Sequence, residues 1–215
     1  MQEKHITVSK TARYFTLGQL SPSIEQVWYI FHGYGQLASD ILKDFSDIAK
    51  DSCYFIAPEG FSRFYLSGTS GDVGASWMTT EDRYNEIADY LQYLDIVNEQ
   101  ATQKLPKQEI KTILFGFSQG VSTVCRWLEQ LRVEADRLVL WAGIIPPEVD
   151  LWKIKAHYPS LQVYLVAGTQ DPYARSDVIK EQEERLEKAE MHYRKIRFDG
   201  KHELHITTLT KFIGY

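Results

Sequence analysis

The sequence has little cysteine, and its two cysteines are far apart. Cys53 and Cys125 lie in apolar segments of a 215-residue chain, so we expect buried, reduced thiols and no disulfide framework. The histidines and cysteines also lack the spacing of metal ligands. We therefore expect neither a metal site nor another cofactor.

Long apolar runs and an excess of positive charge are missing as well. No run approaches the ~18 residues of a membrane span, and the first residues lack the apolar core of a signal peptide. We therefore expect a cytoplasmic protein without stable membrane insertion. The formal net charge of −5 disfavours nucleic acid as a partner, because nucleic acids bind basic patches.

The remaining composition is that of a globular protein, with 44% hydrophobic and 25% charged residues. A chain of this length can bury a large core, and we expect one domain over residues 1–215. Apolar, strand-like runs alternate with segments of helical periodicity, which predicts a mostly parallel sheet with helices on both faces. The expected strands are 27–31, 53–57, 112–117, 138–143, 161–168 and 193–198, with one or two antiparallel edge strands in 5–17. The expected helices are 39–49, capped by Ser39 or Asp40, then 81–102, 119–131, 177–190 and 205–213.

Residues 58–80 are predicted to form a long irregular connection that is rich in aromatic residues. Loops of this length inside a compact domain are usually functional or disordered, and the aromatic content argues against disorder. We interpret Phe64, Tyr65, Trp77 and Met78 as an apolar wall for substrate. Ordinary packing beneath the loop is the alternative for all four residues.

The stretch Gly116-Phe117-Ser118-Gln119-Gly120 follows the strand-like run 112–117 and precedes a helical pattern. This is the arrangement of a nucleophile elbow, in which a sharp turn lifts the serine hydroxyl above the end of a sheet. Both glycines are expected because a Cβ at either position would collide with a neighbouring strand or helix. Chance produces the same pattern roughly once in fifteen chains of this length, so the motif needs partners elsewhere.

Two later strands are followed by an acidic residue and a histidine that we expect to form a catalytic triad with Ser118. Asp171 follows the strand 161–168, and His202 follows the strand 193–198. Since the carboxyl ends of parallel strands share one edge of the sheet, these three side chains are expected to meet there. A serine needs a base to take its proton, and the base needs a carboxylate to orient it.

Other residues compete for the acid and base positions. His205 is the rival to His202, but we expect it to begin the last helix. Asp177 and Asp199 are reserve acids: Asp177 is expected to cap a helix, and Asp199 lies too close in sequence to His202 to face it.

Backbone donors for a developing oxyanion are expected from two segments. Gln119 follows the nucleophile at a helix N-terminus, and Tyr34 lies in His32-Gly33-Tyr34-Gly35 after an earlier strand. Each N–H of this kind contributes about 3 kcal/mol in the transition state. His32 itself is interpreted as a residue that stabilises the turn.

Six blocks of the chain resemble the α/β-hydrolase superfamily, and most closely its phospholipase/carboxylesterase branch, which includes acyl-protein thioesterases. The blocks are His32–Gly35, Pro58–Glu59–Gly60, Gly116–Gly120, Ala142–Pro146, Gly168–Pro172 and Gly200–Glu203. The resemblance implies an α/β-hydrolase fold without a separate lid domain and a triad of Ser118, Asp171 and His202. The branch commonly carries Trp, an aromatic residue and Asp in the long loop, whereas this chain reads Trp77-Met78-Thr79.

The function expected from these residues is hydrolysis of small-molecule carboxylic esters with small or medium acyl groups. The expected protein is a monomer or homodimer. A thioesterase or a lysophospholipase for longer acyl chains is the first alternative. A non-catalytic, hydrolase-like binding module is the second, although a scaffold has no need of all three triad residues together.

Overall fold

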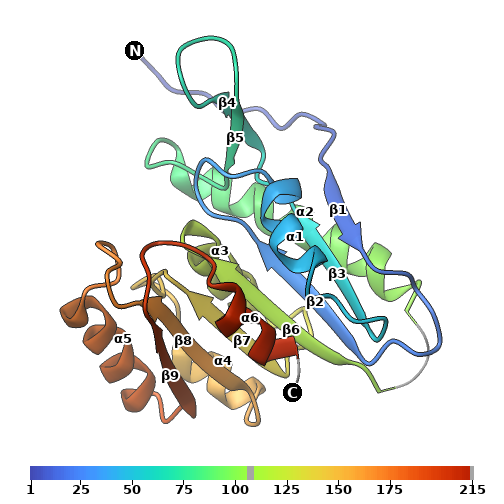
Figure 1. The fold of residues 1–215 in the computed structure, drawn as a ribbon. Helices are drawn as coiled ribbons and strands as arrows, with labels where there is room; N and C mark the ends of the chain where they lie inside the picture. Colours follow the sequence, from blue (N-terminus) through green and yellow to red (C-terminus); the bar gives the residue numbers. More distant parts are fainter. Residues whose placement is uncertain (106–108, 214–215) are drawn as a thin grey trace.

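The computed structural model describes residues 1–105 and 109–213, and a seven-stranded sheet in the order β1-β3-β2-β6-β7-β8-β9 forms its centre (Figure 1). Within the described chain, β1 runs antiparallel to β3, and all other neighbouring pairs in this sheet are parallel. The strands are β1 (Tyr14–Leu17), β2 (Gln26–Phe31), β3 (Cys53–Pro58), β6 (Lys111–Phe117), β7 (Arg137–Trp141), β8 (Gln162–Gly168) and β9 (Tyr193–Phe198). The mostly parallel sheet and the antiparallel edge strand are confirmed.

Helices cover both faces of this sheet, as the alternation of strands and helices predicts (Figure 1). One core contains side chains of α2, α3, α4 and α5, and a second core contains those of α1 and α6. The helices are α1 (Ala38–Ser46), α2 (Arg83–Thr102), α3 (Gln119–Glu129), α4 (Leu151–His157), α5 (Ser176–Lys188) and α6 (Ile206–Ile213). The short helix α4 is the one that the sequence pattern did not predict.

The inner strand β2 shows why the chain folds around this sheet. Its residues Val27, Tyr29 and Phe31 enter the first core, and Trp28 and Ile30 enter the second. All five side chains are at most 1% exposed. Burying side chains of this kind contributes roughly 1.5–3 kcal/mol each, so a strand apolar on both sides is stable only between two layers of helices.

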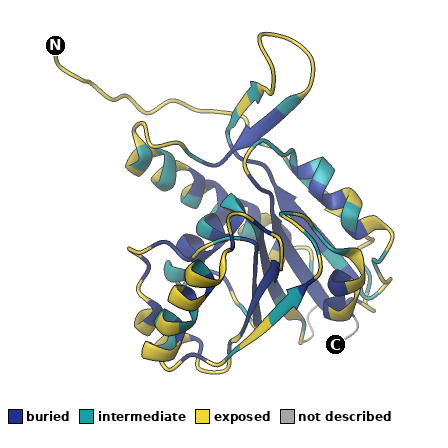
Figure 2. Ribbon diagram, turned by 60° about the vertical axis from the view of Figure 1, so that its left-hand side comes forward, coloured by how far each residue is buried: buried dark blue, intermediate teal, exposed yellow. Residues whose placement is uncertain are grey.

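The long connection 58–80 is not irregular, which corrects the expectation from the sequence. It folds into an antiparallel hairpin of β4 (Ser62–Tyr65) and β5 (Val73–Ser76). The hairpin stands out from the body of the molecule, with an exposed turn and a buried base (Figure 2). Gln36 pairs with Ala75, so β5 is fixed against the segment that follows β2.

Helix α1 begins differently from the sequence prediction. Its N-cap is Leu37, which provides no side-chain hydrogen bond, and Ser39 and Asp40 lie inside the first turn. The Ala38 N–H donates instead to the Glu59 carboxylate, 3.3 Å away. A distant acidic residue thus replaces the expected local cap, and its negative charge suits a helix N-terminus.

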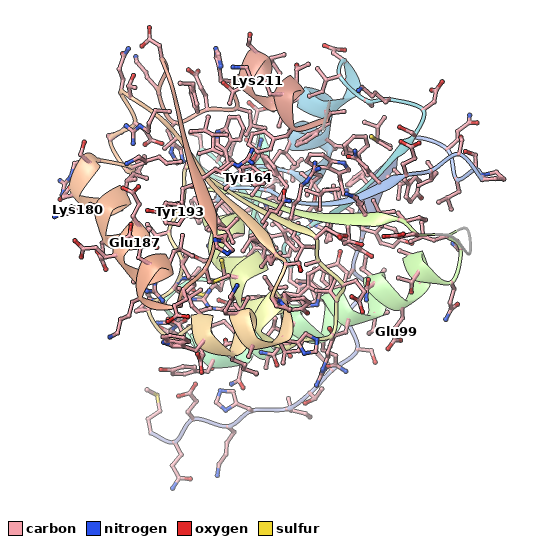
Figure 3. All side chains as sticks on the ribbon, turned by 90° about the horizontal axis from the view of Figure 1, so that it is seen from below. Glu99, Tyr164, Lys180, Glu187, Tyr193 and Lys211 are labelled. Atoms are coloured by element: carbon pink, nitrogen blue, oxygen red, sulfur yellow. The ribbon has the colours of Figure 1, made fainter. Side chains whose placement is uncertain are left out.

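Helix α5 forms a charged outer face, as predicted for residues 177–190. Lys180 and Glu187 project from it, and Tyr193 of β9 lies beside it (Figure 3), donating a hydrogen bond to Glu187. Cys53 and Cys125 are free and buried, as expected. Among the described residues, no helix is both long and apolar enough to cross a membrane.

Candidate active site

Ser118 occupies a strained turn between β6 and α3. Its φ of 52° lies in the left-handed region that residues with a side chain rarely adopt. The turn is crowded on both sides: a Cβ on Gly116 would lie 2.6 Å from the Gly120 carbonyl oxygen, and one on Gly120 would lie 2.2 Å from the Phe31 oxygen. The predicted need for both glycines is confirmed, and the geometry is that of a nucleophile elbow.

The structure brings Ser118, His202 and Asp171 into one chain of hydrogen bonds. His202 Nε2 lies 2.9 Å from Ser118 Oγ, and its Nδ1 lies 2.8 Å from Asp171 Oδ2. The three residues follow β6, β9 and β8, and the segment between β9 and α6 arches over this end of the sheet (Figure 1). Because a carboxylate only accepts hydrogen bonds, Nδ1 carries the proton and Nε2 is free to accept the serine proton.

The Asp171 carboxylate is held firmly in this position. Its side chain is fully buried, and its Oδ1 accepts hydrogen bonds from the N–H groups of Tyr173 and Ala174 at 2.8 and 3.3 Å. The His202 ring is flanked by Phe117 and by Tyr173, with ring centroids 5.1 and 4.9 Å away. These contacts leave the imidazole little freedom to turn away from Ser118.

The competing acids and base have other partners. His205 directly precedes α6, as expected, and its Nδ1 lies 2.8 Å from Thr208 Oγ1. Asp177 pairs with Arg175, and Asp199 accepts a hydrogen bond from the Gln170 side chain.

His32 fixes the turn that carries Tyr34. The Gly60 N–H donates to His32 Nε2 at 2.9 Å, so Nδ1 carries the proton and donates to the Gly33 carbonyl at 2.8 Å. The side chain is fully buried, and this burial lowers the pKa of His32 to about 4. A neutral imidazole with both nitrogens engaged matches the predicted role in the turn.

The backbone N–H groups of Tyr34 and Gln119 have no acceptor in the described part of the protein. Gln119 is the first residue of α3, where a helix leaves its N–H groups without intrahelical partners. Such a position attracts negative charge.

The four residues interpreted as an apolar wall lie in different settings. Trp77 is buried: it stacks on His32, and its indole N–H donates to the His32 carbonyl. Phe64 is partly exposed and lies 5.2 Å from the Tyr34 ring, between centroids. Tyr65 is exposed on the hairpin, and Met78 is partly buried, with its sulfur accepting from Arg126.

Two other features of the described chain stand apart from the triad. Glu3, His5 and Asp82 bring potential metal ligands together, but all three are exposed. A cavity of about 230 Å³ includes Val27 and Thr112, which lie near the amino ends of their strands, opposite to the end that carries Ser118.

Comparison with known families gives one match, which spans residues 22–214 and describes phospholipases and carboxylesterases. The chain belongs to the phospholipase/carboxylesterase family. It is therefore an α/β-hydrolase of the class that hydrolyses carboxylic esters. A search of the curated proteins gives no match.

Solved structures share the fold of this phospholipase/carboxylesterase family member at low sequence identity. A carboxylesterase from Mesorhizobium loti is 12% identical with a TM-score of 0.71, covering 94% of each chain. Acyl-protein thioesterase 2 from Zea mays is 13% identical with a TM-score of 0.69, covering 95% of this chain and 98% of its own. Esterase PE8 is 20% identical with a TM-score of 0.66, covering 95% and 99%.

Sequence reasoning missed two side chains around the site of this family member. Glu59 is buried and accepts hydrogen bonds from Arg13, Arg63 and the Ala38 N–H. The sequence predicts a role for Gln119 only through its backbone, whereas its carboxamide forms hydrogen bonds with residues 76–78. Pro58-Glu59-Gly60 was a block of the resemblance, but a short motif does not reveal partners that are distant in sequence.

Proposed function

We propose that this protein hydrolyses carboxylic esters of small or medium acyl groups through an acyl-enzyme intermediate on Ser118. The observation that carries the proposal is the continuous chain of hydrogen bonds from Ser118 through His202 to the buried Asp171. This geometry suits a nucleophile, a general base and a carboxylate that orients the base and stabilises its cation.

The reaction proceeds in two halves. Ser118 Oγ attacks the acyl carbon while His202 takes its proton, and the carbonyl oxygen becomes an oxyanion. His202 then returns the proton to the leaving alcohol as the carbon–oxygen bond breaks. Water, deprotonated by His202, then attacks the acyl carbon. The bond to Ser118 Oγ breaks as His202 returns the proton to that oxygen, and the acid is released.

The N–H groups of Tyr34 and Gln119 are the proposed donors to the oxyanion. In the described part of the chain these two N–H groups have no acceptor, and each donor of this type contributes about 3 kcal/mol to the transition state. The partly exposed pair of Tyr34 and Phe64 supports the proposal that substrate lies against the hairpin.

A thioesterase is the principal alternative, because the same triad attacks a thioester carbonyl. Rates on an oxyester and a thioester with the same acyl group distinguish the two activities. A lysophospholipase acting on long acyl chains differs in the chain length that it prefers.

A fluorophosphonate probe tests the nucleophile. We expect stoichiometric labelling of the wild-type protein and none of Ser118→Ala, with hydrolysis of p-nitrophenyl butyrate falling at least about 10³-fold in the variant. Folded wild-type protein that neither labels nor turns over would contradict the proposed function.

A matched pair of histidine variants tests the base. His202→Ala should lose most turnover because Ser118 then has no proton acceptor, whereas His205→Ala should retain it because its imidazole lies against Thr208. The kcat values of both variants on the same ester make the comparison, and the reverse order would overturn the assignment of the base.

A further inference from the structure

The side chain of Gln119 joins the nucleophile elbow to the end of β5. Its Oε1 accepts a hydrogen bond from the Trp77 N–H at 3.1 Å, and its Nε2 donates to the Met78 carbonyl at 2.8 Å. Ser76 Oγ lies 3.2 Å from the same Nε2, and Ser76 is 1% exposed. The oxygen and the nitrogen of the carboxamide therefore both bond to residues 76–78, at the end of β5 and directly after it.

The same hairpin also holds the segment that contains Tyr34. The Gly35 N–H donates to the Ala75 carbonyl at 2.9 Å, and Gln36 pairs with Ala75. Gly74 packs so tightly that a Cβ there would lie 2.3 Å from the Gly35 carbonyl oxygen. Backbone contacts thus fix β5 to one side of the site.

The two proposed oxyanion donors belong to separate parts of the chain. Tyr34 lies in the turn after β2, and Gln119 begins α3. Strand β5 contacts the first through its backbone. The Gln119 carboxamide bonds to Ser76 at the end of β5 and to residues 77–78 directly after it. The hairpin and the two residues after it therefore connect the two donor segments directly.

We propose that the Gln119 carboxamide is a positioning residue, which sets the two backbone donors at the separation required by the oxyanion. This inference rests on the proposed function and deepens it. Donor positions matter because the stabilisation arises only when both N–H groups meet the oxyanion in the transition state. A misplacement of about 1 Å can cost on the order of a hundredfold in rate.

Gln119→Ala and Gln119→Met test the proposal, since both keep the backbone N–H and methionine also keeps most of the side-chain volume. We expect kcat on p-nitrophenyl butyrate to fall roughly ten- to a hundredfold in each, with KM changed less than about threefold. Phenylboronic acid forms a tetrahedral adduct with an active serine, and its inhibition constant should rise by a similar factor. Gln130→Ala, at the other end of α3, is the control and should change neither quantity.

The outcomes separate positioning from folding. The positioning role is supported if the Gln119 variants are still labelled completely by a fluorophosphonate but have a lower kcat and bind the boronic acid more weakly. The positioning role would be overturned by a kcat of Gln119→Ala within twofold of the wild-type value. It would also be overturned if the loss of kcat followed the loss of melting temperature across the variants. Wild-type protein that fails to label contradicts the proposed function itself, before any Gln119 variant is compared.

Discussion

At the scale of single residues, His32 shows how a polar side chain is accommodated in the core. Its two ring nitrogens bond to Gly33 and Gly60, and Trp77 stacks on the ring. The neutral imidazole satisfies one acceptor and one donor, while a buried cation there would lose hydration without gaining a counter-charge in contact. The turn that carries Tyr34 therefore depends on an uncharged histidine.

This dependence predicts a loss of stability in mild acid. Burial lowers the folded pKa of His32 from 6.5 to about 4, so the unfolded chain binds more protons between these values. The free energy of unfolding should consequently fall as pH decreases from 6.5 to 4, by on the order of 3 kcal/mol. Urea unfolding across this range measures the slope.

His32→Gln provides the control, because glutamine can accept from the Gly60 N–H but does not titrate. Its stability should be nearly flat over the same window, even if lower throughout. The two proteins are compared between pH 6.5 and 4.5, which separates His32 from Glu59: burial opposes ionisation of Glu59, but hydrogen bonds from Arg13 and Arg63 outweigh burial and keep its pKa below 4.5. Its contribution is present above that pH and is lost only on further acidification. An unchanged slope in the variant would contradict the role given to His32.

Position relative to a strand is the signal from which the sequence predicts that distant side chains lie close together. Ser118, Asp171 and His202 each follow a parallel strand, so topology alone brings them to one edge. His205 directly precedes α6, and its Nδ1 lies against Thr208 Oγ1 instead of facing Ser118. The Gln119 carboxamide was missed because its partners, residues 76–78, are about forty positions away in the chain and no periodicity connects them.

At the scale of elements, the sequence predicted long helices and buried strands but not the hairpin. Strands β4 and β5 have four residues each, which is too short for alternation to distinguish them from a loop. Their pairing is stabilised by tertiary contacts such as the bridge between Gln36 and Ala75. The predicted start of α1 was wrong for the same reason, because tertiary contacts decide it. The first N–H of the helix bonds to Glu59, twenty-one residues away.

The hairpin's contact with the turn after β2 predicts an effect of Gly74→Ala on catalysis. The added methyl group would meet the backbone of Gly35 and push the hairpin and the Tyr34 segment apart. We expect kcat on a short ester to fall about tenfold or more, because the Tyr34 N–H, one of the two proposed oxyanion donors, moves. Steady-state kinetics and a melting curve measure the two effects separately.

Gly68→Asn is the matched control for this hairpin variant. Gly68 has a φ of 63° and open space around it, and asparagine tolerates this conformation better than other residues. Its kinetics should equal those of the wild type. If Gly74→Ala had the same kcat as the wild type, the hairpin would not be what holds the Tyr34 segment in the position needed for catalysis.

At the scale of the whole molecule, the two cores leave little room beneath Ser118. A Cβ on Gly33 would lie 3.3 Å from the Ser118 Cβ, and one on Gly143 would lie 2.4 Å from the Ser118 carbonyl oxygen. Trp77 is buried beside His32 and closes the hairpin side. We therefore expect an acyl chain to lie along the surface, where Tyr34 and Phe64 are accessible, and not within the core.

Surface binding predicts a preference for short acyl chains among p-nitrophenyl esters. A methylene that is fully buried contributes about 0.8 kcal/mol, but one on an open aromatic surface gains only part of this. We expect kcat/KM to rise modestly from acetate to hexanoate and to fall beyond about eight carbons. Phe64→Ala should flatten the rise, whereas Trp152→Ala, an exposed aromatic on α4, should not. A steady increase up to palmitate would instead favour a lysophospholipase, because only an extended apolar groove continues to reward added methylenes.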